Sequence, residues 1–320
     1  MKKIILMAIL LIFLIGIVGC TKNTADKTET LAGSDVKVVK IAYLPITHAL
    51  PLFVEKELQN QADSKIKIEL VKYGSWPELM DALNTGKVDG ASVLIELALK
   101  AKEQGIDLKA VALGHKDGNV VIVNKDINSV ADLKGKTFAI PHKQSSHNLL
   151  LDQMLADAGI TKKDVKIVEM APAEMPSALS QGQIAGYCVA EPFGAKAVSL
   201  GIGKVLYQSP DLWKDSICCA LVFNNAFIQS NKDAAMATVS QYQTAGKYIT
   251  EHKAEANGIA KKYMNVDDSV LDLSLNWISY NDLEIKRDAY EDLITRMKRA
   301  GLSENSPAYD DFVDASLWKK

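Results

Sequence analysis

The sequence predicts an α/β protein of two lobes that carries an additional helical segment at its C-terminal end. Strand-length and helix-length stretches alternate from residue 36 to about residue 228, and the remainder has helical periodicity throughout. Residues 36–320 are more than the ~250 residues that one hydrophobic core usually holds. Strands that alternate with helices predict largely parallel sheets with helices on both faces.

The N-terminal residues predict an export signal. Residues 4–19 contain no charged or polar side chain and follow Lys2 and Lys3, which is the pattern of a signal peptide. Residues 17–20, Ile-Val-Gly-Cys, resemble the lipobox of bacterial lipoproteins, which implies removal of residues 1–19 and lipidation of Cys20. A transmembrane anchor is the alternative, and either interpretation places the rest of the chain outside the cytoplasm. Residues 20–35 are polar and aperiodic, so we expect a flexible tether there.

The first half of the remaining chain contains a regular series of strands and helices. Ser75, Trp76, Pro77 and Glu78 predict a capping box at the start of the first clear helix, with Ser75 as the N-cap. We expect strands at 36–43, 66–73, 88–93, 109–113 and 120–123, and helices at 77–85 and 95–104.

The second half predicts a further sheet and then helices. Two extended stretches, 120–124 and 220–224, could cross together as a hinge, which divides the chain into lobe 1 (36–123 plus 224–320) and lobe 2 (124–223). We expect the C-terminal helices to pack on lobe 1. The predicted strands are 137–141, 165–170, 184–190 and 203–208, and the predicted helices are 231–252, 254–264, 267–278, 283–300 and 307–315.

Charge and cysteine content exclude several classes of protein. The chain has 37 Lys and Arg against 39 Asp and Glu, a formal net charge of -2, so no nucleic-acid partner is expected. Cys188, Cys218 and Cys219 are an odd number, which is not a disulfide framework, and adjacent cysteines form a disulfide only with strain. We interpret all three as small buried residues.

Four segments carry a resemblance to a known family, together with the lipobox. They are KIAYLPITHALPLFV, KYGSWPELMDALNTGKVDGASV, VADLKGKTFAIPHKQSSHNLLLDQMLADAGI and GQIAGYCVAEPFGAKA. They resemble the solute-binding proteins of ABC importers, in the branch for nitrate, sulfonate, taurine and thiamine precursors (NMT1-like). The resemblance implies a type II periplasmic-binding-protein fold with two hinge strands. It also implies a monomer without enzymatic activity or cofactor, which delivers a small molecule to a permease and its ATPase.

The turns after the predicted strands contain most of the candidate ligand-binding side chains. In open parallel sheets, ligands bind beyond the carboxyl ends of the strands, where helix N-termini point inward. Ser145 or Ser146 is the expected N-cap of one such helix, and Trp76 either stacks on a ligand or belongs to the core. Glu191 either binds a ligand or clamps the hinge. The full set of candidates is Thr47, His48, Ser75, Trp76, His115, Gln144, Ser145, Ser146, His147 and Glu191.

Several ligand classes remain open at this point. An oxyanion such as a sulfonate or nitrate suits the helix N-termini and histidines, although the predicted turns contain no arginine. A thiamine-precursor heterocycle suits the aromatic residues. A metal ion is a further alternative, with His48, His142, His147 and Cys188 as ligands, but their spacing matches no metal motif. A thiamine-pyrimidine-synthase-like enzyme is the alternative from another class, which the lipobox disfavours.

Overall fold

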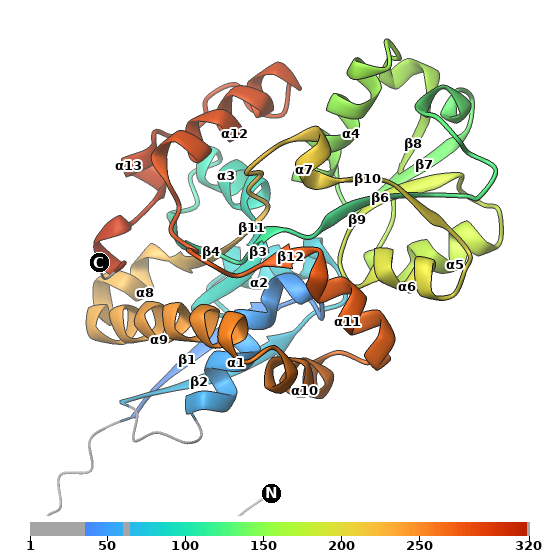
Figure 1. Cartoon of the computed structure of the whole chain (residues 1–320). Coiled ribbons are helices and arrows are strands. Elements are labelled where there is room, and N and C mark those ends of the chain that lie inside the picture. Colours follow the sequence, from blue (N-terminus) through green and yellow to red (C-terminus); the bar gives the residue numbers. More distant parts are fainter. Residues whose placement is uncertain (1–35, 60–64, 319–320) are drawn as a thin grey trace, which may run out of the picture. The chain divides into compact units, whose positions relative to one another are not determined.

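The computed structural model describes residues 36–59 and 65–318, and these contain two five-stranded sheets (Figure 1). The strands of the second sheet come from residues 119–208, and those of the first come from segments before and after them. The first sheet has the order β2-β1-β3-β11-β4, and the second has the order β10-β6-β9-β7-β8. The first is formed by β1 (Lys37–Tyr43), β2 (Ile66–Lys72), β3 (Gly90–Leu94), β4 (Leu108–Leu113) and β11 (Cys219–Asn224). The second is formed by β6 (Asn119–Val123), β7 (Thr137–Ile140), β8 (Lys166–Glu169), β9 (Gly186–Ala190) and β10 (Lys204–Gln208).

Both sheets are mixed rather than fully parallel. In the first sheet β1 pairs in parallel with β2 and β3, whereas β11 is antiparallel to β3 and β4. In the second, β7 is parallel to β8 and β9, whereas β6 and β10 are antiparallel to their neighbours. In each sheet the strand that runs opposite to its neighbours, β6 or β11, is the strand that follows a crossing between the lobes. The expected two-lobed α/β fold is confirmed.

The chain crosses between the lobes earlier than the sequence predicts. β6 lies in the second sheet and β11 lies in the first, so the crossing segments are residues 114–118 and 209–218. The boundaries 123/124 and 223/224 placed β6 in lobe 1 and β11 in lobe 2, and the topology contradicts both assignments. The reason is that each extended stretch pairs with a sheet along its length and does not itself bridge the lobes.

The helices cover the faces of the two sheets. Those of the first lobe include α1 (Leu50–Gln59), which packs against α9 and α10, while α13 packs against β4. The helical segment packs on lobe 1 as expected, and α11 in addition packs against α6 of the second lobe. The others are α2 (Trp76–Asn84), α3 (Ile95–Glu103), α4 (Ser146–Asp157), α5 (Met175–Ser180), α6 (Phe193–Ser199), α7 (Ser209–Leu212), α8 (Asn225–Ser230), α9 (Lys232–Glu251), α10 (Lys253–Tyr263), α11 (Asp268–Asn276), α12 (Arg287–Arg299) and α13 (Tyr309–Phe312).

Helix N-termini show how the local sequence positions the elements. Ser145 caps α4 by accepting a hydrogen bond from the N–H of Asn148 at 3.2 Å. Ser75 occupies the N-cap of α2 as predicted, but its side chain makes no capping hydrogen bond, so the expected capping box does not form. Pro77 in the first turn and burial of Trp76 fix the start of α2 instead.

The predicted export signal, lipobox and tether lie outside the described residues. Within residues 36–59 and 65–318, no helix combines the length and hydropathy that a membrane span requires.

Candidate functional site

Four buried side chains from separate segments meet where the two crossings join the first sheet. They are His48, His115, Cys218 and Cys219, and one potential metal-binding atom from each lies within 4.8 Å of all the others. We call these four residues the His/Cys cluster. His48 lies in the short helical turn Thr47–Ala49 after β1, and His115 lies in the first crossing. Cys218 ends the second crossing and Cys219 begins β11, so the fold assembles residues 171 positions apart in the chain.

Gly114 allows these segments to approach. Its N–H donates to the carbonyl oxygen of Cys219 at 2.7 Å. A side chain at this position would place its Cβ 2.8 Å from the carbonyl oxygen of His48 and 3.3 Å from the Cβ of Cys219. Only glycine therefore fits between the His48 turn and the cysteines.

The spacing of the donor atoms matches that of ligands around a single tetrahedral ion. His48 Nδ1 lies 3.4 Å from Cys219 Sγ and 3.8 Å from Cys218 Sγ, and the two sulfur atoms are 3.9 Å apart. Zinc–nitrogen bonds of about 2.0 Å and zinc–sulfur bonds of about 2.3 Å place tetrahedral ligand atoms roughly 3.4–3.8 Å apart. The cluster is thus already close to the dimensions of a metal site.

Hydrogen bonds fix the orientation of both cluster histidines. His48 Nε2 lies 3.1 Å from the carbonyl oxygen of Gly118, and His115 Nδ1 lies 2.7 Å from that of Asp117. A carbonyl oxygen can only accept, so these two ring nitrogens carry the protons. The other nitrogen of each ring is then unprotonated: His48 Nδ1 lies against the two cysteine sulfur atoms, and His115 Nε2 accepts from the N–H of Cys219 at 3.4 Å. Metal-binding histidines are typically held in this way by a carbonyl on the far side of the ring.

The electrostatics of the cluster favour the forms that bind metal. Burial and the neighbouring His48 lower the pKa of His115 to about 4, so its ring is neutral at pH 7. Burial disfavours the Cys218 thiolate. Four neighbouring groups outweigh the effect of burial and hold the pKa of Cys218 well below its usual range: the Cys219 thiol and the rings of His147, His115 and His48. Burial and the neighbouring Cys218 raise the pKa of Cys219 well above its usual range. A thiolate and neutral imidazoles are therefore present together.

Two further buried residues border the cluster. His147, the second residue of α4, is 0% exposed, and neither of its ring nitrogens has a hydrogen-bond partner among the described residues. Burial lowers its pKa to about 4, with Cys218, His48 and His115 close enough to act on it. Glu96 of α3 is also fully buried, and burial and Cys218 raise its pKa well above the usual range. Unpartnered buried polar groups of this kind are costly unless a ligand satisfies them.

Thr47 and Glu191 join the two lobes beside the cluster. The N–H and the hydroxyl of Thr47 both donate to the carbonyl oxygen of Glu191, each at 3.0 Å. Tyr280 donates its hydroxyl to the carbonyl oxygen of Thr47 at 2.7 Å. The Glu191 carboxyl accepts from the N–H of Ala195 at the start of α6, at 3.0 Å. The contact between the lobes thus uses the backbone carbonyl of Glu191, whereas its carboxyl is bonded within the second lobe.

The other predicted residues lie in several different places. Gln144 donates to the carbonyl oxygen of Leu302 at 2.9 Å, which links the second lobe to the C-terminal segment. Ser146 is buried, and its hydroxyl has no partner among the described residues, whereas Ser145 is occupied with capping. Trp76 is part of the main hydrophobic core, and Ser75 beside it is only half-buried.

The metal ligands proposed from the sequence do not all lie in the His/Cys cluster. His48 belongs to the cluster, but His142 accepts from the N–H of Gln144 at the surface and Cys188 is buried in β9. Cys218 and Cys219, interpreted from the sequence as core residues, are buried as expected but direct their sulfur atoms at a histidine. The signal that could have identified them is their position at the end of a crossing segment, next to a predicted hinge.

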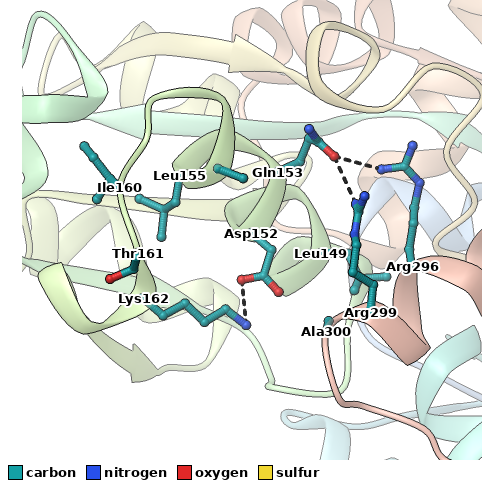
Figure 2. Close-up of a pocket in the computed structure, with 11 residues that line it drawn as sticks. Leu149, Asp152, Gln153, Leu155, Ile160, Thr161, Lys162, Arg296, Arg299 and Ala300 are labelled. Atoms are coloured by element: carbon teal, nitrogen blue, oxygen red, sulfur yellow. Dashed lines mark hydrogen bonds and ion pairs between the residues drawn. The ribbon is translucent and has the colours of Figure 1, made fainter.

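A second hollow lies between α4 and α12 and contains none of the cluster residues (Figure 2). It has a cavity volume of about 420 Å³. Figure 2 shows that its polar side chains bind one another: Lys162 pairs with Asp152 at 2.7 Å, and Arg296 and Arg299 both donate to Gln153 Oε1, at 3.3 and 3.2 Å. This hollow is therefore a contact between the lobes at the edge of the molecule.

Known proteins resemble this chain over most of its length. Residues 32–263 match the NMT1-like family. The nitrate/nitrite binding protein NrtA of Nostoc is 28% identical over 78% of this chain and 67% of its own length. A putative aliphatic sulfonates-binding protein of Bacillus subtilis is 26% identical over 85% of this chain and 81% of its own length. The chain spans only 36% of a nitrate import ATP-binding protein, NrtC of Synechococcus elongatus, at 29% identity.

Solved structures extend the likeness to the fold. A crystal structure of the ligand binding component of an ABC-type import system from Staphylococcus aureus, with zinc bound, is 43% identical over 88% of this chain and 98% of that chain, with a TM-score of 0.84. The periplasmic nitrate-binding protein NrtA from Synechocystis has a TM-score of 0.80 at 20% identity, over 89% of this chain and 88% of that one. The expected relationship to nitrate- and sulfonate-binding components of ABC importers is confirmed, and the chain belongs to the NMT1-like family.

Proposed function

We propose that this chain is the solute-binding component of an ABC importer and that its cargo is a thiophilic metal ion such as zinc, bound by the His/Cys cluster. The observation that carries the proposal is the orientation of His48 and His115. Each ring donates its outer N–H to a backbone carbonyl, so the inner nitrogen of each is unprotonated and lies beside the two cysteine sulfur atoms, with His115 Nε2 accepting a long hydrogen bond from the N–H of Cys219.

The chemistry of the donors supports a soft cation. Thiolate and imidazole ligands suit zinc and other thiophilic ions, whereas magnesium and calcium require oxygen ligands. The Cys218 thiolate can attract a cation, and the four cluster residues include no lysine or arginine that would hold an anion. The Staphylococcus aureus relative with zinc bound is consistent with this assignment.

The burial of the cluster supports transport rather than catalysis. All four cluster residues are at most 1% exposed, so an ion can enter or leave only when the lobes separate. A receptor that encloses its ion in this way carries it to a permease and releases it on opening. We further propose that the partners are an ABC permease and its ATPase, that the chain acts outside the cytoplasm as a monomer, and that a lipid on Cys20 attaches it to the membrane.

A second candidate cargo is an oxyanion such as nitrate or a sulfonate. The names of the relatives support it, as does the start of α4, where the Ser146 hydroxyl has no partner among the described residues. The first turn of a helix offers free N–H groups to an anion.

A titration experiment distinguishes the two cargoes. The full chain, purified in detergent and stripped with a chelator, is titrated by calorimetry with zinc chloride, sodium nitrate and an alkanesulfonate. We expect one zinc ion per chain and no heat from the anions. Cys218→Ala should weaken zinc binding by roughly 100-fold or more, since loss of an outer-shell partner alone costs roughly 10- to 100-fold. Cys188→Ala, a matched change in the β9 core, should leave zinc binding intact.

The opposite result identifies the alternative. Binding of nitrate or the sulfonate by a chain that takes up no zinc would assign the cargo to the oxyanions and leave the cluster as a packing feature.

A further inference from the structure

We propose that His147 is the ligand that the second lobe contributes to the metal ion, so that it links metal occupancy to closure of the lobes; this inference rests on the proposed metal cargo. It adds a fifth residue to the His/Cys cluster and assigns that residue a role different from the other four.

The four cluster residues cannot link the lobes by themselves. His48 and Cys219 belong to the first lobe, and His115 and Cys218 lie on crossing segments directly next to β4 and β11 of the same lobe. An ion bound by these four alone would be held equally well with the second lobe near or far. A ligand shifts a conformational equilibrium only when its affinity differs between the two states. Closure therefore requires a donor from the second lobe.

His147 has the properties of that donor. It lies in the first turn of α4, whose N-terminus Ser145 caps, so the backbone that carries the ring is fixed. The ring is 0% exposed, and both nitrogens are without hydrogen-bond partners in the described parts of the chain. An unsatisfied buried donor or acceptor costs roughly 1–3 kcal/mol. A bond to the metal ion would remove this cost in the closed state only.

Other side chains of the second lobe are less suitable. The Glu191 carboxyl already accepts from the N–H of Ala195, and Cys188 is a fully buried residue of β9 whose thiol pKa is raised by burial. The Ser146 hydroxyl is buried nearby, but a neutral hydroxyl is not among the usual ligands of zinc, whereas imidazole is. The four cluster donors complete a tetrahedral site, so an imidazole from α4 would be a fifth ligand, a coordination number that zinc also adopts.

The experiment compares three variants of the full chain in detergent. His147→Ala removes the ring, His147→Cys restores a metal-binding side chain at the same position, and His142→Ala removes a surface histidine five residues away. Zinc affinity is measured by competition with a chelating dye. Closure is measured by hydrogen exchange of peptides that contain the Thr47 N–H, which is bonded to Glu191 across the lobes.

We expect zinc to protect the Thr47 peptide from exchange in the wild type and in His142→Ala. His147→Ala should still bind zinc through the cluster, with affinity reduced about 10-fold or more, and should show no zinc-dependent protection. His147→Cys should recover a large part of both effects. A thiol could not substitute for a ring that served only to fill space. Recovery in His147→Cys would therefore identify His147 as a metal ligand and not as a packing residue.

Two failures are distinguishable. If the wild type and His142→Ala take up no zinc, the metal cargo itself is wrong. If zinc binds and protects the Thr47 peptide equally in the wild type and in His147→Ala, the cargo stands and the role of His147 is refuted.

Discussion

Cys188 and Cys218 show what the fold does to two residues of the same type. Both are fully buried, as the sequence predicts for thiols that form no disulfide framework. Cys188 points into a strand-rich core, where burial raises its pKa, while Cys218 faces three histidines that lower its own. The burial of a cysteine can be predicted from its residue type. The groups that shift its pKa cannot, because they come from distant parts of the chain, as His147 does for Cys218, more than 70 positions away.

The buried carboxyl of Glu191 should make the stability of the folded chain depend on pH. Burial raises the pKa of its carboxyl to about 8, with the N–H of Ala195 opposing the shift. A carboxyl whose pKa is higher in the folded than in the unfolded state binds its proton more tightly when folded. Its contribution to stability is therefore complete below about pH 4.5 and is lost as the pH rises to about 8.

Glu191→Gln should remove this dependence. The amide keeps the acceptor for the Ala195 N–H but does not titrate. From pH 5 to pH 8 the free energy of unfolding of the metal-free wild type should therefore fall further than that of the variant, by roughly 2–4 kcal/mol. Urea unfolding at pH 5, 6.5 and 8 measures this difference. Glu174→Gln, at an exposed position of the same lobe, is the control. Equal slopes for the wild type and Glu191→Gln would show that the carboxyl is not buried as described.

Strands were predicted more reliably than the lobe to which each one belongs. All ten strands of the two sheets occur within a few residues of their expected bounds, because β-branched runs between turn residues are a local signal. The assignment of β6 and β11 was wrong because pairing partners are not local: β6 bonds to β9, and β11 to β3. The short pair formed by β5 (Lys116–Asp117) and β12 (Ile278–Ser279) was missed because two residues carry no periodicity.

The same distinction applies to the candidate site. His48, His115 and His147 were selected because they follow predicted strands, and the topology of α/β sheets brings such turns together. Ser75 and Trp76 satisfy the same rule, yet α2 directs Trp76 into the core. A turn position can be inferred from sequence, but the direction of its side chain depends on packing.

Helix α12 makes contacts that we expect to help hold the lobes closed. Its Arg296 and Arg299 donate to Gln153 of α4 (Figure 2). The Arg296 guanidinium also lies 4.6 Å from the centre of the Trp213 ring. Hydrogen bonds of this kind contribute about 0.5–1.5 kcal/mol each, and a cation–π contact adds about 0.5–1 kcal/mol near the surface.

Replacement of both arginines by alanine should therefore lower the population of the closed state. Because apparent affinity scales with the fraction of binding-competent chains, the dissociation constant for zinc should rise by about 10-fold. The chelator competition assay measures it. Arg287→Ala is the matched control, since Arg287 begins the same helix but pairs with Asp310 at 2.7 Å within the C-terminal segment. An unchanged zinc affinity in the double variant would mean that α12 does not stabilise closure.

At the scale of the whole molecule, several contacts join the two lobes, while the four cluster residues all lie in or directly next to the first lobe. Thr47 and Glu191 connect the lobes on one side of the cluster, and Gln144 connects the second lobe to Leu302 of the C-terminal segment. The helical segment thus contacts both lobes, through α9 and α10 on the first and α11 on the second. A segment attached to both lobes must change some of its contacts whenever they separate.

The proposed attachment to a membrane concerns the whole molecule, and it would depend on a lipid at Cys20. An acyl chain contributes roughly 0.8 kcal/mol for each buried CH₂ group, and two or more chains give stable anchoring. In a bacterial host fed a labelled fatty acid, the wild-type chain should take up label and sediment with membranes. Cys20→Ala should take up no label and should either leave the membrane fraction or keep residues 1–19, which the mass of the protein distinguishes. Cys188→Ala should behave as the wild type. Label retained by Cys20→Ala would exclude the lipobox, and residues 4–19 would then act as an anchor that spans the membrane.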